Sequence, residues 1–303
     1  LGYAHMTQKI AIAVVHGIGK TNPSFKDEND PKKFVGGIAP RLKKAFAKEL
    51  EPISPQADED LIFEPVYWAD VLQDFQDELY NRLNIRDRVS QFFGLRDFIF
   101  HSLADSVAYQ PTFPQPSSED GGVGDPNIYR NVHEVFAWTL NRLSRRTGTD
   151  APLCIIGHSM GAAIATNYIW DAQKNRFPPN SGDTPLENVE TLSALYTFGS
   201  QIPFWAMRFS NFGTPPQIPS PTVTTYYPNL TGEWLNFYDR HDLLGYPIRD
   251  INDTYRQLVT EQEVSVGGLL KGWNTLSHNE YWTSTDVTHA IARSLARIWK
   301  QIN

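Results

Sequence analysis

The stretch that decides the fold is PLCIIGHSMGAAIATNYIW, residues 152–170. Residues 152–156 form a short apolar run typical of a buried strand, and residues 162–170 read as a helix of small and then large apolar side chains. Between them lies GHSMG, which fits the pattern G-x-S-x-G around Ser159. Such a pattern arises by chance on the order of once in ten chains of this length. The strand, turn and helix around it therefore carry more weight than the pattern alone.

A sharp turn from a buried strand into a helix is the setting in which a serine nucleophile is presented. Gly157 and Gly161 let the backbone turn at Ser159 and let the helix approach the strand closely. The start of the helix, at Met160, offers a backbone N–H group to a developing oxyanion. The alternative is that Ser159 only caps the helix.

Strand and helix patterns alternate on both sides of this segment. A continuous apolar run predicts a strand over 10–15, and Pro65 places a second strand, 61–68, at a sheet edge or shortens it. Apolar residues at helical spacing predict further helices. Such alternation is typical of an α/β domain with a mainly parallel sheet flanked by helices. Further strands are expected at 192–198 and 234–238. Helices are expected at 34–50, 128–143 and 286–302. Another helix is expected to start at Asp70 as its N-cap, with Leu72, Phe75, Leu79 and Leu83 on one face.

Length and composition favour one well-packed domain. The chain has 303 residues, of which 41% are hydrophobic, and we expect residues 6–303 to form a single domain. The formal charge of −7 gives no basic surface for nucleic acid or anionic lipid. No apolar run reaches the roughly 18 residues of a membrane span, so stable membrane insertion is not expected.

The cysteine content and the N-terminus predict a cytoplasmic location. Cys154 is the single cysteine, so no intrachain disulfide can form, and its apolar surroundings predict a buried thiol. Residues 1–5 precede Met6 and lack the features of a signal peptide, so we interpret them as a cloning remnant.

Residues 84–126 interrupt the alternation with an aromatic segment followed by a turn-rich one. We interpret this stretch as an inserted helical cap or lid over Ser159 that excludes water from the site. The alternative is a satellite core packed on the edge of the sheet.

A serine nucleophile needs a base to take its proton. In this setting the chain order is serine, acid, histidine, so the base must be one of the three histidines that follow Ser159. His289 faces away from the apolar stripe of the last helix, and His241 adjoins the candidate acids too closely to orient freely. His278 lies in a loop-like neighbourhood of Gly, Asn and Ser, and we predict it to be the base; the alternative is an ordinary loop residue.

Two aspartates that follow the strand 234–238 compete as the acid. Asp239 touches the strand end and could pair with Arg240 or cap the turn. Asp242 lies further into the loop, and we predict that it orients His278.

A second oxyanion N–H should come from the loop after the first strand. Gly17 and Gly19 permit close approach there, so we predict that the N–H groups of Ile18 and Met160 form the oxyanion hole. The alternative is that only their side chains matter, as pocket walls.

Nucleotide and metal sites are not predicted. The residues before Lys20 fail the P-loop pattern because position 14 is Val14, and the dinucleotide pattern fails at Asn22. Neither a zinc motif nor a calcium loop is present in the sequence, so no cofactor and no metal are expected.

Five segments together resemble the α/β-hydrolase superfamily, especially its lipases and esterases: VVHGIGK (14–20), IIGHSMG (155–161), YTFGSQIP (196–203), LNFYDRHDLL (235–244) and SHNEYW (277–282). The resemblance implies the α/β-hydrolase fold and the roles of Ser159, Asp242, His278 and Ile18 given above. Gln201 stands where the family often has proline, and the segment 84–126 has no fixed family counterpart.

The expected activity is hydrolysis of carboxylic esters through an acyl-enzyme, with a small-molecule ester or lipid as the substrate. A thioesterase or amidase would use the same residues. A catalytically silent lipid- or protein-binding module is the alternative of a different class.

Overall fold

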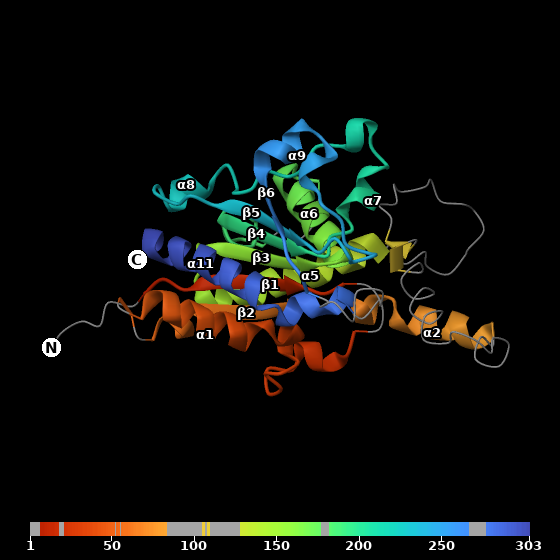
Figure 1. Ribbon diagram of the computed structural model, residues 1–303, viewed down its shortest axis with the longest axis horizontal. Helices are drawn as coiled ribbons and strands as arrows, with labels where there is room; N and C mark the ends of the chain where they lie inside the picture. Colours follow the sequence, from red (N-terminus) through yellow and green to blue (C-terminus); the bar gives the residue numbers. More distant parts are fainter. Residues whose placement is uncertain are drawn as a thin grey trace.

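The fold centres on a six-stranded sheet in which every neighbouring pair of strands is parallel (Figure 1). The computed structural model describes residues 7–17, 21–51, 53–54, 56–83, 105–106, 108–109, 128–176, 182–266 and 277–303. The strand order is β2-β1-β3-β4-β5-β6. Because all strands run the same way, their carboxyl ends meet at one edge of the sheet, where the loops after β1, β3, β4 and β5 converge. The strands are β1 (Ile10–Val15), β2 (Leu61–Val66), β3 (Leu153–His158), β4 (Leu192–Phe198), β5 (Glu233–Tyr238) and β6 (Val259–Glu263).

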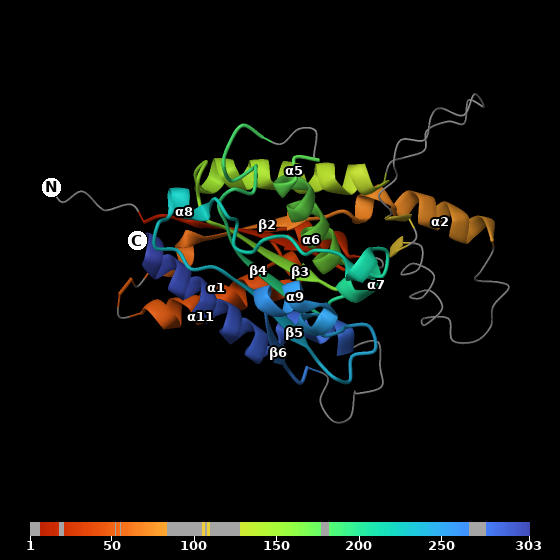
Figure 2. The same cartoon turned by 90° about the horizontal axis from the view of Figure 1, so that it is seen from above.

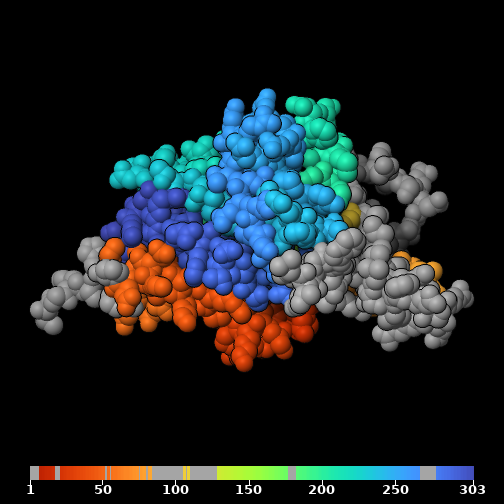
Figure 3. All heavy atoms as spheres, viewed as in Figure 1, coloured from red at the N-terminus to blue at the C-terminus, as the bar shows by residue number. Residues whose placement is uncertain are grey.

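Helices cover both faces of the sheet (Figure 2). On one face, α1 (Ile38–Leu50) packs beside α11 (Thr285–Ile302), and their contact is visible in the space-filling view (Figure 3). On the other face lie α5 (Ile128–Thr147) and α6 (Met160–Gln173). Alternate residues of β1 serve the two cores, since Ile12 packs with the first helix pair and Ala13 with the second.

Shorter helical segments complete the described part of the chain. They are α2 (Gln73–Arg82), α7 (Ile202–Ala206), α8 (Val223–Tyr226) and α9 (Asp253–Leu258), with 3-10 turns at Pro23–Lys26, Phe34–Gly37, Ala57–Asp60, Ala69–Val71, Ser210–Phe212, Arg249–Ile251 and Ser277–Thr283. None of the helices within the described residues has the length and apolar character needed to cross a bilayer.

The predicted fold class is confirmed. The sheet is parallel throughout, helices flank it, and the chain turns from β3 into α6 at Ser159, which together make an α/β-hydrolase fold. The strand at 10–15 and the strand at 192–198 have the predicted bounds. Pro65 lies in β2, which is an edge strand as its proline predicts.

The helix predicted from Asp70 begins later than expected. Asp70 lies in the 3-10 turn Ala69–Val71, and α2 starts at Gln73 with Leu72 as its N-cap, so Asp70 as N-cap is wrong. Leu79 and Leu83 are about half exposed rather than buried on a common face. Among the side chains that the structure describes here, Leu72 at the N-cap is buried in the core, and Gln76 is buried in the first part of the helix.

The sequence prediction missed β6, the other edge strand of the sheet. Its residues VTEQE are polar, and only Val259 is buried. Hydrophobic periodicity could not find it, because Val259 is the one apolar residue among the five and no alternation of apolar and polar side chains results.

Most of the predicted cap at 84–126 lies outside the described residues, so the cap stays a prediction. Tyr109, one of its aromatic residues, is fully buried. Its ring stacks on Tyr129 of α5 at 4.9 Å and meets Trp205 of α7 edge-on. Tyr109 is therefore held between α5 and α7.

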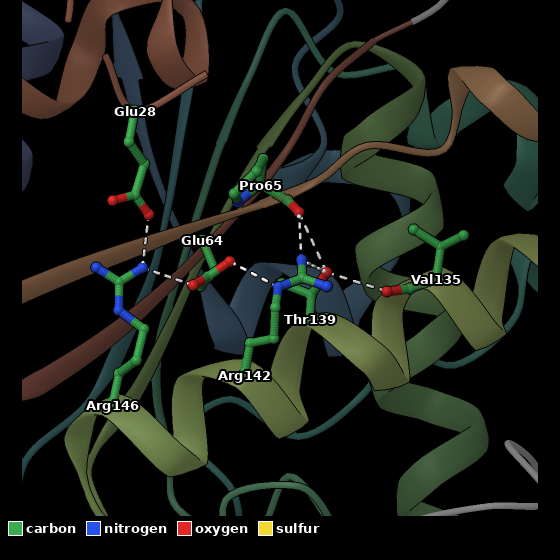
Figure 4. Close-up of polar contacts among 7 residues, drawn as sticks. All are labelled: Glu28, Glu64, Pro65, Val135, Thr139, Arg142 and Arg146. Carbon is green, nitrogen blue, oxygen red and sulfur yellow. Dashed lines mark hydrogen bonds and ion pairs between the residues drawn. The ribbon is translucent and has the colours of Figure 1, made fainter. Parts of the chain in front are cut away.

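A polar cluster holds α5 against the edge strand β2 (Figure 4). Both carboxylate oxygens of the buried Glu64 are paired, one with Arg142 Nε at 2.8 Å and the other with Arg146 Nη1 at 2.6 Å. Thr139 Oγ1 and Arg142 Nη2 also donate to the carbonyl oxygen of Pro65. These side chains occupy a backbone acceptor that an unprotected edge strand would offer to another chain.

Candidate active site

Ser159 sits on a strained turn between β3 and α6. Its backbone angles are φ 57° and ψ −124°, a conformation that L-residues rarely adopt. The turn is held by the Ser159 N–H, which donates to the Phe198 carbonyl at 3.0 Å, and by the Gln201 N–H, which donates to the Ser159 carbonyl at 3.4 Å. The serine is thus locked to the end of β4 in a conformation that costs free energy.

Glycines around the turn allow three chain segments to meet. A Cβ at Gly161 would lie 2.6 Å from the carbonyl oxygen of Val15, and one at Gly17 would lie 2.7 Å from the Cβ of Ser159. No real side chain tolerates such distances, so both positions require glycine. The loop after β1 therefore lies directly against the candidate nucleophile.

His278 and Asp242 form a buried pair. His278 Nδ1 donates to Asp242 Oδ2 at 2.8 Å and lies 3.0 Å from Oδ1. Asp242 Oδ1 also accepts from the Leu244 N–H at 2.9 Å. Glycine at position 245 makes this turn feasible, because a Cβ there would collide with Asp242 Oδ2. The structure thus brings together the base and the acid that the sequence predicts.

The environment keeps Asp242 ionised. Burial by itself would raise the pKa of its carboxyl group. The hydrogen bond from His278 and the charge of His278, together with hydrogen bonds from Leu244 and Tyr281, outweigh burial and lower the pKa below its ordinary value. An ionised carboxylate at Nδ1 fixes the tautomer of His278, leaving Nε2 as the proton acceptor.

His158, the residue before Ser159, holds the backbone of His278 in place. Its Nε2 donates to the backbone carbonyl of His278 at 2.8 Å, and the two rings lie 4.7 Å apart. Burial, and then the neighbouring His278, lower the pKa of His158 well below its ordinary value. His158 is therefore a neutral donor.

Two buried polar atoms at the centre of this arrangement have no hydrogen-bond partner within the described chain: Ser159 Oγ and His278 Nε2. The structure does not form the bond between serine and histidine. It does bring their neighbours together, because His158 binds the backbone of His278 and a Cβ at Gly199 would lie 3.0 Å from His278 Cε1. In unliganded sites catalytic hydrogen bonds are often long and tighten only with substrate.

The other candidate acid and the other candidate bases bond to different groups or are exposed. Asp239 caps the loop after β5, where its carboxylate accepts from the N–H groups of His241 at 2.9 Å and Val266 at 2.7 Å. His241 is exposed and contacts Asp239. His289 is exposed on α11. Asp239 therefore caps its loop, whereas Asp242 carries the bond to His278.

Of the two residues predicted to form the oxyanion hole, the structure describes Met160. Met160 is the first residue of α6, and no described residue accepts a hydrogen bond from its N–H. Ile18 lies outside the described residues. The start of its loop is fixed by His16, whose Nδ1 donates to the Gly17 carbonyl at 2.8 Å and whose Nε2 accepts from the Trp68 N–H at 3.1 Å.

Sequence reasoning missed the supporting roles of His16, His158 and Tyr281. All three bear on the candidate residues through contacts between segments far apart in the chain. All three lie in segments that carry the resemblance, 14–20, 155–161 and 277–282, so the sequence indicated their positions but not their partners. Over the part of the chain that is described, no cluster of three or more His, Cys, Asp or Glu could hold a metal.

Comparisons with known proteins give structural neighbours only. The sequence matches no protein-family model and no curated protein. The esterase domain of a Rhodothermus marinus protein is similar to this chain with a TM-score of 0.37 and 11% identity, over 98% of this chain and 90% of that one. A Xanthomonas campestris pv. campestris protein assigned to the α/β hydrolase superfamily gives a TM-score of 0.30 and 13% identity, over 90% of this chain and 98% of that one. The candidate site therefore rests on the geometry of this chain alone.

Proposed function

We propose that the chain is a serine hydrolase that cleaves carboxylic esters through an acyl-enzyme on Ser159. The observation that carries the proposal is the strained backbone of Ser159, a non-glycine residue at φ 57° whose Oγ is buried and unpaired within the described chain. Strain of this kind persists where function requires it. A serine that only capped α6 would accept a hydrogen bond from the first turn, and Ser159 makes no such bond.

The proposed reaction begins with attack of Ser159 Oγ on the ester carbonyl carbon. His278 Nε2 takes the serine proton, and Asp242 stabilises the imidazolium through its bond to Nδ1. The Met160 N–H donates to the oxyanion, with the Ile18 N–H as the predicted second donor. The intermediate then expels the alcohol, which takes the proton from His278, and water repeats the sequence to release the carboxylic acid.

Other acyl substrates are the nearest alternatives. Thioesters and amides would use the same groups, because only the leaving group differs. A silent binding module would have no need for an ionised carboxylate bonded to a histidine beside a strained serine.

The test is hydrolysis of p-nitrophenyl esters from acetate to palmitate, beside a matched thioester and anilide. We expect ester hydrolysis that survives a chelator and falls at least about 10³-fold in Ser159→Ala. Ser193→Ala is the matched control, because Ser193 is equally buried but bonds to the Thr191 carbonyl. Faster cleavage of the thioester or anilide would reassign the substrate, and equal activity in Ser159→Ala would overturn the proposal.

A further inference from the structure

Tyr281 connects both aspartates that follow β5. Its hydroxyl donates to Asp242 Oδ2 at 3.0 Å and accepts from the backbone N–H of Asp239 at 2.8 Å. The side chain is fully buried, and its ring stacks on Phe198 at 5.8 Å. The hydroxyl therefore both donates and accepts a hydrogen bond, and these two bonds fix its orientation.

The geometry leaves little freedom for this contact. Tyr281 lies on the same 3-10 turn as His278, three residues later, so both reach the same carboxylate from one rigid element. Gly199 packs against both side chains, since a Cβ at this position would lie 3.0 Å from His278 Cε1 and 3.1 Å from Tyr281 Cε2. Asp242 Oδ2 therefore receives two donors from one turn.

We propose that Tyr281 is a positioning residue that sets the strength with which Asp242 binds His278, and so the pH at which the site becomes active. The inference rests on the proposed function. The hydroxyl shares the negative charge of the carboxylate with His278 Nδ1, and a carboxylate with one donor fewer holds the imidazolium more tightly. Removal of the hydroxyl should therefore keep His278 protonated to higher pH.

Tyr281 remains a proton donor throughout. Burial, and then the charge of Asp242, raise the pKa of its hydroxyl above the ordinary value. Within the described part of the chain, the other titratable groups near the pair are His158 at the end of β3, Asp239 after β5 and, beyond His158, His16 after β1. Burial keeps both of these histidines neutral near pH 7, so neither competes for the same change.

The experiment measures the pH dependence of kcat/KM and of fluorophosphonate labelling in the full chain and in Tyr281→Phe. We expect the acid limb of both profiles to move to higher pH by about half a unit or more, since half a unit needs only a small part of a charge-assisted hydrogen bond. The plateau should fall by about tenfold as the pair loses its fixed geometry. In Asp242→Asn, the further change Tyr281→Phe should no longer move the labelling profile, because the two residues act through one contact.

Tyr168→Phe is the matched control. Tyr168 is as buried as Tyr281, but its hydroxyl has no hydrogen-bond partner in the described chain. An acid limb in Tyr281→Phe identical to that of the wild type and of Tyr168→Phe would overturn the inference. Absence of labelling in the wild type would instead overturn the proposed function.

A second variant covers the case in which Tyr281→Phe does not fold. Placing 3-fluorotyrosine at position 281 alone keeps the shape and makes the hydroxyl a stronger donor. The acid limb should then move to lower pH, opposite to Tyr281→Phe. No movement with 3-fluorotyrosine would also contradict the role proposed for Tyr281.

Discussion

Ser159 adopts a backbone conformation that glycine would occupy without strain. A buried serine at φ 57° costs about 1 to 3 kcal/mol, which the surrounding hydrogen bonds to β4 must offset. Stability is therefore given up at the residue that the proposed chemistry needs.

Replacement of Ser159 by glycine and by alanine separates strain from chemistry. Both variants should lose activity, but Ser159→Gly should be more stable than Ser159→Ala by about 1 kcal/mol, because only glycine relieves the positive φ. Urea unfolding of the two variants measures the difference. Equal stabilities would show that the turn is not strained.

The two aspartates should respond differently to the same change. Asp242→Asn should lower kcat/KM by about 10²-fold or more, because the amide no longer stabilises the imidazolium of His278. Asp239→Asn should leave kcat/KM within about threefold and mainly lower the melting temperature, since Asp239 caps backbone N–H groups of its loop. Kinetics and thermal melts of both variants test this, and the reverse ranking would make Asp239 the acid.

At the scale of elements, the apolar signals of the sequence located the strands and helices that carry the site. Continuous runs such as 10–15 and 192–198 predict strands buried on both faces, and β1 and β4 have those bounds. The polar strand β6 and the late start of α2 were not predictable this way. At those positions tertiary contacts, rather than periodicity, decide the local structure.

The cluster that fastens β2 to α5 gives a prediction about stability. Glu64→Gln should destabilise the fold by about 1 to 2 kcal/mol, because it weakens two pairings of a buried carboxylate with partly exposed arginines. Glu28→Gln is the control, since Glu28 bonds the same Arg146 from an exposed position and should cost less than about 0.5 kcal/mol. Denaturant midpoints of the two variants measure this, and equal losses would contradict the role assigned to Glu64.

For the candidate site, the sequence predicted residues and the structure supplied their partners. Asp242 and His278 are 36 positions apart. Their bond could be inferred only from the chain order serine, acid, histidine that is known for serines on a turn between a buried strand and a helix. The contacts of Tyr281 and His158 depend on how the turn Ser277–Thr283 sits against β3, β4 and β5. Such side-chain contacts between segments distant in sequence leave no periodic pattern.

At the scale of the whole molecule, buried neutral histidines predict how stability depends on pH. Burial lowers the pKa of His16 to about 4 and that of His133 to about 3. Between these values and about 6.5 the unfolded chain binds more protons than the folded one, so stability falls as pH is lowered through this window. His16 alone accounts for on the order of 3 kcal/mol between pH 6.5 and 4.

Urea midpoints at several pH values between 7.5 and 4.5 measure this slope. His133→Gln should flatten it, and His289→Gln should not, because His289 is exposed on α11. A midpoint that stays constant over this range would contradict the neutral state of the buried histidines.

The most direct measurement of the central claim is the site of covalent labelling by a fluorophosphonate probe, read by peptide mass spectrometry on the intact chain. Attack by an activated serine predicts a single adduct on the peptide that contains Ser159, formed faster as pH rises through the acid limb and absent in Ser159→Ala. Asp242→Asn and His278→Ala should slow the labelling by about 10²-fold or more. An adduct on another serine, or labelling at Ser159 that does not depend on His278, would contradict the account.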